Sequence, residues 1–199
     1  VIGTFIMVAT YSLFYIMTAF AQAYSRTPAT LSEAGYPMGL GIPANTFTGL
    51  LLMSAIVFAI FISISGIYAD KIGRRKWLIW TTVSILIFAL CMPLFLGNGT
   101  PTSVFAFLVI GMALMGMTFG PMAALLPELF PTEVRYSGAS LAYNIASIIG
   151  ATIAAMISLK INALYGLMGV GIYLAINAFL TLLALLASKE TKNVDLTQI

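Results

Sequence analysis

The stretch that decides the fold is TFTGLLLMSAIVFAIFISISGIY (residues 46–68), which ends directly before the charged segment ADKIGRRK (residues 69–76). A bilayer core about 30 Å thick is crossed by roughly 20 apolar residues in a helix. A membrane β-strand would instead alternate apolar and lumen-facing residues over about ten positions, and residues 50–62 show no such alternation. The stretch therefore predicts a transmembrane α-helix.

Five more uncharged stretches reach a similar length, so we expect an all-α membrane protein with six transmembrane helices. The expected spans are residues 2–24, 46–68, 77–96, 103–126, 139–159 and 167–188. Of the 199 residues, 61% are hydrophobic and 8% are charged, whereas a soluble domain carries about 25% charged residues. This composition excludes soluble enzymes and nucleic-acid-binding proteins, and most of the surface is expected to face the lipid bilayer.

The basic residues predict the orientation of the chain. With six spans, both chain ends share one side of the membrane with the second and fourth loops. That side holds seven of the nine Lys and Arg residues, namely Lys71, Arg74, Arg75, Lys76, Arg135, Lys189 and Lys192. Arg26 and Lys160 are on the other side. Because positive charge is retained on the cytoplasmic side, both ends are expected to be cytoplasmic, with Trp77 and Trp80 at the cytoplasmic interface.

Several kinds of site are excluded by the residues that the chain lacks. There is no histidine, and Cys91 is the only cysteine, so neither a His-centred triad nor a disulfide framework can form. None of the expected spans carries Asp, Glu, Lys or Arg in its interior. We therefore expect no metal, no cofactor and no enzymatic activity, and an intramembrane enzyme is the remote alternative.

The most specific motif is GIYADKIGRR (residues 66–75), which combines a span end, a turn and three cations. Gly66 is expected to allow two helices to approach closely, and Gly73 to permit the turn into the next helix. The motif resembles the signature loop of the major facilitator superfamily, a family of twelve-helix secondary transporters. There it joins the second and third helices of a six-helix half, as it does here.

A second stretch, GPMAALLPELFPTEVRYSGASLAYN (residues 120–144), is similar to the junction of helices ten and eleven in the metabolite:proton symporter branch of that superfamily. The KETK segment at residues 189–192 resembles the end that follows helix twelve. The resemblance implies that residues 1–199 are the C-terminal half, helices seven to twelve, built as a 3+3 inverted repeat. The chain opens at Val1 in apolar sequence, so we expect it to be cut from a longer protein whose N-terminal half is absent.

The resemblance also implies a cytoplasmic gate, in which charged side chains lock the inner side of the transporter in its outward-open state. The residues carried over to this gate are Gly66, Asp70, Gly73, Arg74, Arg75, Glu128, Arg135 and Glu190. Opposite charges near helix ends can form such pairs. The alternative for exposed members is a set of solvated charges worth about 0–1 kcal/mol each.

Polar stripes on two spans predict a substrate pathway. At 100° per residue, the first stripe falls within about 60° and the second within about 100° of helix circumference. Their members are Tyr11, Tyr15, Thr18 and Gln22 in the first span, and Ser140, Tyr143, Asn144 and Ser147 in the fifth. Polar side chains at membrane depth favour a protein interior or an aqueous cavity, although Ser and Thr also join helices.

Other polar and small residues are expected to serve packing. In the fourth span Gly116 and Gly120 have the spacing for close helix contact, and Gly120-Pro121 is expected to break or kink the helix. Asn177 and Thr181 in the last span lie outside both stripes and are interpreted as packing contacts.

The resulting hypothesis is a secondary active transporter of the bacterial inner membrane. It would move a small organic metabolite, such as a carboxylate or compatible solute, together with protons and by alternating access. The titrating residue would then lie in the absent N-terminal half. The alternatives are an uncoupled facilitator or sugar-type porter of the same superfamily, and a six-helix protein that dimerises.

Overall fold

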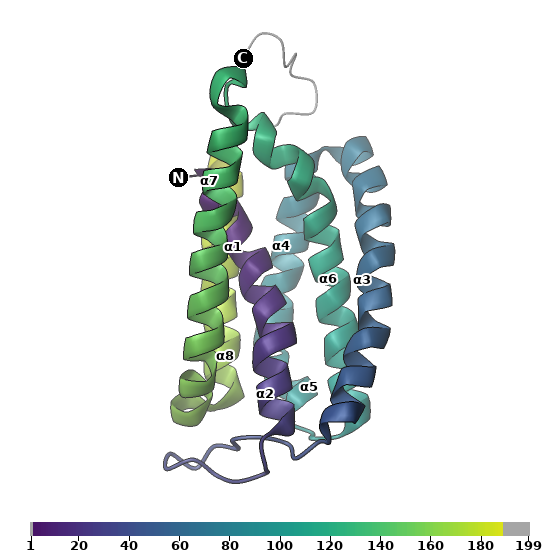
Figure 1. Cartoon of the computed structure of the whole chain (residues 1–199), viewed down its shortest axis with the longest axis vertical. Helices are drawn as coiled ribbons and strands as arrows, with labels where there is room; N and C mark the ends of the chain where they lie inside the picture. The colour runs from purple at the N-terminus through teal and green to yellow at the C-terminus, as the bar shows by residue number, and fades with distance from the viewer. Residues whose placement is uncertain (1, 189–199) are drawn as a thin grey trace.

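A computed structural model of the chain describes residues 2–188, which are helical apart from connecting loops and an isolated bridge between Leu31 and Pro37. Figure 1 shows the helices side by side in an elongated bundle, with the α2–α3 connection crossing its lower end. The elements in chain order are α1 (Ile2–Tyr15), η1 (Ile16–Phe20), α2 (Ala21–Arg26), α3 (Ala44–Ile72), α4 (Arg74–Leu90), α5 (Met92–Leu96), α6 (Pro101–Glu128), η2 (Thr132–Val134), α7 (Arg135–Ser147), η3 (Ile148–Ile153) and α8 (Ala154–Ala187).

Four helical stretches are long and apolar enough to cross a membrane: Ile2–Arg26, Ala44–Ile72, Pro101–Glu128 and Met156–Ala187. The prediction of an all-helical chain is confirmed for the residues described. The other two expected spans are also helical, but one is divided at Cys91, between α4 and α5, and the other passes from α7 into the π-helix η3. Six membrane crossings and the inverted repeat stay predictions.

Helix α8 contains a reversal of the chain at Gly166. This residue has φ 69° and ψ −171°, a conformation that glycine adopts without the steric cost of a Cβ. The first leg ends at the α2–α3 connection, where the carbonyl of Ala163 accepts a hydrogen bond from Ser32. The second leg ends beside the start of α4, where the carbonyl of Leu185 accepts one from Arg75. The reversal coincides with the expected loop at residues 160–166.

The joint between α3 and α4 is a single residue, Gly73. Its φ of 113° and ψ of 128° end α3 and allow α4 to begin at Arg74, as the sequence predicted. Helix α6 begins more conventionally, because the side chain of Thr100 accepts a hydrogen bond from the backbone N–H of Ser103 at 3.2 Å and Pro101 occupies the first turn.

The sequence predicts that Gly120-Pro121 breaks or kinks the fourth span; the break is wrong, and the kink stays a prediction. Helix α6 continues through Pro121 and Pro127 to Glu128. Proline has no N–H, so Pro121 leaves the carbonyl of Met117 without its partner four residues later. The indole Nε1 of Trp77 donates a hydrogen bond to that carbonyl at 2.9 Å, so a side chain of α4 replaces the missing backbone donor.

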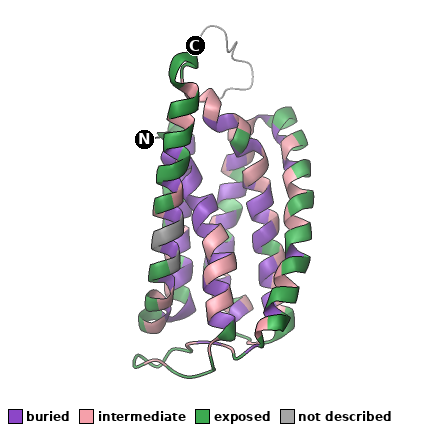
Figure 2. Ribbon diagram, in the orientation of Figure 1, coloured by how far each residue is buried: buried purple, intermediate pink, exposed green. Residues whose placement is uncertain are grey.

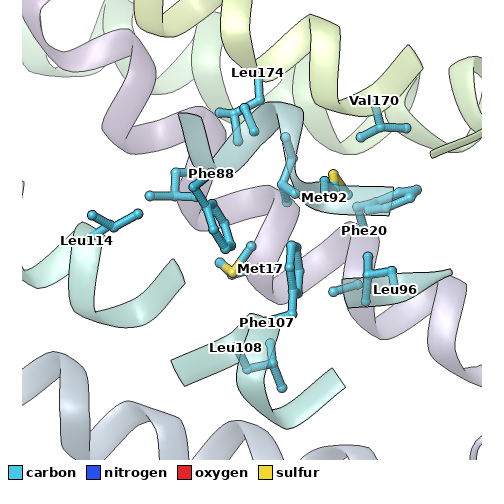
Figure 3. Packing of buried hydrophobic residues seen from close by; sticks show 14 of the residues in the cluster. Met17, Phe20, Phe88, Met92, Leu96, Phe107, Leu108, Leu114, Val170 and Leu174 are labelled. Atoms are coloured by element: carbon cyan, nitrogen blue, oxygen red, sulfur yellow. The ribbon is translucent and has the colours of Figure 1, made fainter. Parts of the chain in front are cut away.

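The apolar core lies between α1–η1, α4–α5, α6 and the second leg of α8 (Figure 3). The rings of Phe88 and Phe107 stack within it at 5.2 Å. Of the residues in the most apolar part of each stretch, 72% are buried in Ile2–Arg26 and 11% in Ala44–Ile72. Figure 2 shows α3, largely exposed, at one side of the bundle. The first helix is therefore the centre of this chain, and α3 is at its margin.

Candidate functional site

The ends of α3, α4 and α6 meet in an ion cluster formed by Asp70, Arg74 and Glu128. The Arg74 Nε lies 3.1 Å from Oδ1 of Asp70, one turn earlier. Its Nη1 pairs with Oε1 of Glu128, the last residue of α6. Gly73 makes this possible, because the turn that it permits places Arg74 at the first position of α4, beside the end of α6.

The two pairs differ in their exposure to solvent. The side chain of Glu128 is 15% exposed and that of Arg74 is 25% exposed, whereas that of Asp70 is 64% exposed. Burial lowers the pKa of the Arg74 guanidinium, but hydrogen bonds to Glu128 and Asp70 and their negative charges outweigh it, so the pKa is raised. Arg74 therefore stays charged, and the partly buried pair with Glu128 is the stronger of the two contacts.

The other predicted gate residues divide between different sites. Arg75 donates from Nε and Nη2 to the carbonyls of Leu185 and Leu186, at 2.7 and 2.8 Å, and so caps the end of α8. Arg135 donates to the carbonyl of Phe130 and the hydroxyl of Thr132 within its own loop, and among the contacts found it does not join the ion cluster. Glu190 lies outside the described residues.

Gly66 lies where α3 approaches α6, with its backbone N 3.2 Å from the place of a Cβ on Gly120, but among the described residues its own missing Cβ does not allow this approach. A Cβ built on Gly66 would meet no atom within 4 Å. The close approach of α3 to α6 depends instead on Gly116 and Gly120, where a Cβ would lie 2.7 Å from the carbonyl oxygens of Phe58 and Ile62 respectively. Their spacing predicted this contact correctly, but the glycines that provide it are on α6.

The two polar stripes meet at Tyr11 and Tyr143, whose rings lie edge to face at 5.4 Å. Tyr11 is buried, whereas Tyr15, Thr18 and Gln22 are half-buried, as is Ser147 of the second stripe, and Ser140, Tyr143 and Asn144 are exposed. Some of these groups are already partnered: Thr18 donates to the carbonyl of Phe14, and Asn144 to that of Ser140.

A cavity of about 410 Å³ lies between α1, α6 and α7, toward the end of the bundle that holds the ion cluster. Apolar side chains form most of its wall, including Met7, Phe119 and Met122. Arg135, Ser140 and Tyr143 add polar groups. Two residues of the second stripe, Ser140 and Tyr143, thus line a cavity. The other two, Asn144 and Ser147, do not, and neither does any of the four residues of the first stripe.

A polar contact between α8 and α1 was missed as a specific feature. The Thr181 hydroxyl accepts from the N–H of Ala9 at 3.1 Å and donates to the carbonyl of Phe5 at 2.7 Å, so it is inserted between two backbone groups that would pair with each other in an uninterrupted helix. One turn away, Asn177 donates to the hydroxyl of Ser12 at 2.9 Å. Their four-residue spacing was the available signal.

Comparison with known proteins identifies the family. The family described as "Sugar (and other) transporter" matches residues 38–199. The chain belongs to this family. Its members are transporters, so the resemblance to major facilitator transporters is confirmed and the chain is not an enzyme. In residues 2–188, no group of three or more His, Cys, Asp or Glu side chains is placed to hold a metal ion.

Several relatives carry transport names. A protein of Haemophilus influenzae named for metabolite transport is 86% identical over the whole chain, which spans 45% of that protein. The inner membrane metabolite transport protein YhjE of Escherichia coli K12 is 52% identical over 98% of the chain and 43% of its own length. The proline/betaine transporter of Salmonella typhimurium is 31% identical over 73% of the chain and 29% of its length. No solved structure is significantly similar. The chain therefore spans less than half the length of these relatives.

Proposed function

We propose that the chain is the C-terminal half of a bacterial inner-membrane secondary transporter, with both ends of this segment cytoplasmic. The relatives are about twice as long as the chain, and one of them is named as an inner membrane protein. Seven of nine basic residues fall on the side assigned to the cytoplasm. An N-terminal six-helix half of the same protein would be the partner around which this half rocks.

The observation that carries the proposed gate is the ion cluster at the ends of α3, α4 and α6. Arg74 is paired with an acid from each neighbouring helix. Ion pairs of this kind hold three helix ends together and can form in one conformation and separate in the other. We propose that they stabilise the outward-open state by keeping the cytoplasmic side closed, with Gly73 setting the geometry and Arg75 anchoring α4 to α8.

The proposed cargo is a small organic metabolite, such as a carboxylate or a compatible solute. Support comes from the relatives named as proline/betaine transporters. It also comes from the cavity between α1, α6 and α7, where Arg135 offers a positive charge beside Ser140 and Tyr143. The remaining stripe residues would face the pathway once the N-terminal half is present; they are Tyr11, Tyr15, Thr18, Gln22, Asn144 and Ser147.

Proton symport is the proposed coupling, with the titrating group in the N-terminal half. The uncoupled facilitator or sugar-type porter is the second candidate, favoured by the absence of any acidic or basic side chain from the interiors of the expected spans of this half. Uptake of radiolabelled betaine, proline and glucose into proteoliposomes, with and without an inward proton gradient, separates the two. An uptake rate that is the same with and without the proton gradient supports the facilitator.

The gate is tested with Glu128→Gln in the full-length protein. Removing one charge of a partly buried pair is expected to cost about 1–3 kcal/mol, between the exposed and buried extremes. The conformational balance would then move toward the inward-open state by roughly 5- to 150-fold. Accessibility of a single cysteine placed on each side of the membrane measures that balance.

Glu133→Gln is the matched control for the gate, because Glu133 is exposed on η2 and its replacement removes the same charge nearby. It is expected to leave the accessibility pattern and the uptake rate close to those of the parent protein. If Glu128→Gln behaves like this control, the ion cluster is no gate.

A further inference from the structure

A groove of about 540 Å³ runs between α3 and α4 on the surface of the bundle. Its walls come from Phe61, Ile64 and Tyr68 of α3 and from Trp77 and Trp80 of α4, and Met117 of α6 lies at its base. The rings of Tyr68 and Trp77 stack at 5.8 Å across the two helices. Trp77 is held in place by its hydrogen bond to the Met117 carbonyl.

The two side-chain hydroxyls that α4 contributes to the groove, those of Thr81 and Ser84, are already partnered. The Thr81 hydroxyl donates to the carbonyl of Trp77 at 3.0 Å, and the Ser84 hydroxyl donates to the carbonyl of Trp80 at 3.1 Å. A hydrophilic ligand would therefore find few free hydrogen-bond partners there, whereas an alkyl chain would leave neither of these hydroxyls unsatisfied. The groove fits an acyl chain.

The mouth of the groove is positively charged. Lys76 lines it, and the Lys71 Nζ lies 6.0 Å from the centroid of the Tyr68 ring. Both lysines are exposed. The nearby acid, Asp70, is paired with Arg74 at 3.1 Å, which offsets its negative charge. An anionic group at the membrane surface would be attracted to this end.

We propose that this groove binds an anionic phospholipid, with one acyl chain between α3 and α4 and the phosphate beside Lys71 and Lys76. The apolar interior and the cationic mouth suit the two parts of such a lipid, and the mouth lies where the two helices meet at their ends. The proposal is independent of the transported substrate and of proton coupling.

The test uses the purified full-length transporter in a neutral detergent, with dioleoylphosphatidylglycerol as the probe and binding followed by native mass spectrometry. Lys71→Gln/Lys76→Gln is expected to weaken binding by about 30-fold, the equivalent of about 1 kcal/mol for each lysine. Lys160→Gln, a basic residue at the other end of the bundle, is the charge control and is expected to have little effect.

A second pair of variants tests the groove itself. Ser84→Trp places a large side chain in the groove and is expected to reduce phosphatidylglycerol binding at least fivefold. Val83→Trp adds the same side chain on a neighbouring exposed position that does not line the groove, and is expected to retain binding. Retained binding in Ser84→Trp would overturn the proposed acyl-chain position.

The remaining arms distinguish other occupants. Equal binding of dioleoylphosphatidylethanolamine would show a lipid site without the proposed anionic preference and would overturn the proposal. Inorganic phosphate competing as well as the lipid would overturn the role of the acyl chain. Dimers that Ser84→Trp dissociates in lipid-free detergent would make a second copy the occupant and also overturn it.

Discussion

Replacing Trp77 by Phe should reveal how α6 tolerates a proline in its interior. Pro121 leaves the carbonyl of Met117 without a backbone donor, and the Trp77 indole supplies one at 2.9 Å. Phenylalanine keeps an aromatic ring but has no N–H. Trp77→Phe therefore leaves the carbonyl unpaired.

The expected cost follows from the loss of that partner. An unsatisfied buried polar group costs about 1–3 kcal/mol, and the loss of ring area adds to this. Pro121→Ala restores an N–H four residues after Met117, in register for the ordinary helical hydrogen bond. In that background Trp77→Phe should lose only the ring area, so the coupling between the two positions is expected to be about 1–3 kcal/mol.

The measurement is a double-mutant cycle on the full-length protein, with free energies from reversible unfolding in mixed micelles of increasing SDS content. The cost of the lost ring area is common to both backgrounds and cancels in the cycle. Trp80→Phe is the matched control, because Trp80 is 77% exposed and its indole has no hydrogen bond among those found in the described part of the chain. It should cost the same in the parent protein as in the Pro121→Ala background.

The reasoning is refuted if Trp77→Phe costs as much in the Pro121→Ala background as in the parent protein. That result would mean that the indole stabilises the protein only through its area and its stacking on Tyr68. A cost below about 0.5 kcal/mol in the parent protein, less than a typical net hydrogen bond, would likewise show that the Met117 carbonyl finds another donor.

Three further substitutions test contacts between helices, each by the same unfolding measurement. Thr181→Val removes the hydroxyl inserted between Phe5 and Ala9 and should cost about 1–3 kcal/mol of stability. Its control, Thr118→Val, loses only a hydrogen bond to the carbonyl of Met115 in its own helix and should cost less. Equal costs for the two variants would contradict the insertion of the Thr181 hydroxyl into α1. Gly120→Ala should destabilise by about 1–3 kcal/mol, because its Cβ would lie 2.7 Å from the Ile62 carbonyl oxygen, and Gly66→Ala should be neutral or stabilising since its Cβ meets open space. Arg75→Gln should cost about 1–2 kcal/mol of stability, because it removes the donors to the Leu185 and Leu186 carbonyls. Its control, Arg26→Gln, should change stability by less than about 0.5 kcal/mol. A larger loss for Arg26→Gln would show that the change in net charge, and not the lost cap of α8, lowers the stability.

The positions of the helices could be predicted because the signal is local. Apolar runs of the right length predict the long helical stretches. Gly73 predicts the turn, which in the structure brings Arg74 beside Glu128. The spacing of Gly116 and Gly120 predicts a close helix contact, but it does not indicate that the partner helix is α3. For Gly66 the same argument failed, because glycine permits a close approach but does not require one.

The missed contacts depend on pairs of residues far apart in the chain. The sequence shows that Pro121 deprives the Met117 carbonyl of a partner, but only the packing of α4 on α6 shows that Trp77 supplies one. Similarly, the four-residue spacing of Asn177 and Thr181 indicates one polar face, and the contacts with Ser12, Phe5 and Ala9 depend on the return leg of α8 after Gly166.

These contacts between helices fall into two groups. Helix α1 is held on its buried side by Asn177 and Thr181, and it meets the exposed face of α7 through Tyr11 and Tyr143. At the other side, α3 and α6 pack through glycines and share the ion cluster. Helix α6 takes part in both groups, because Glu128 at its end pairs with Arg74 of α4 whereas its other side lines the cavity with α1 and α7.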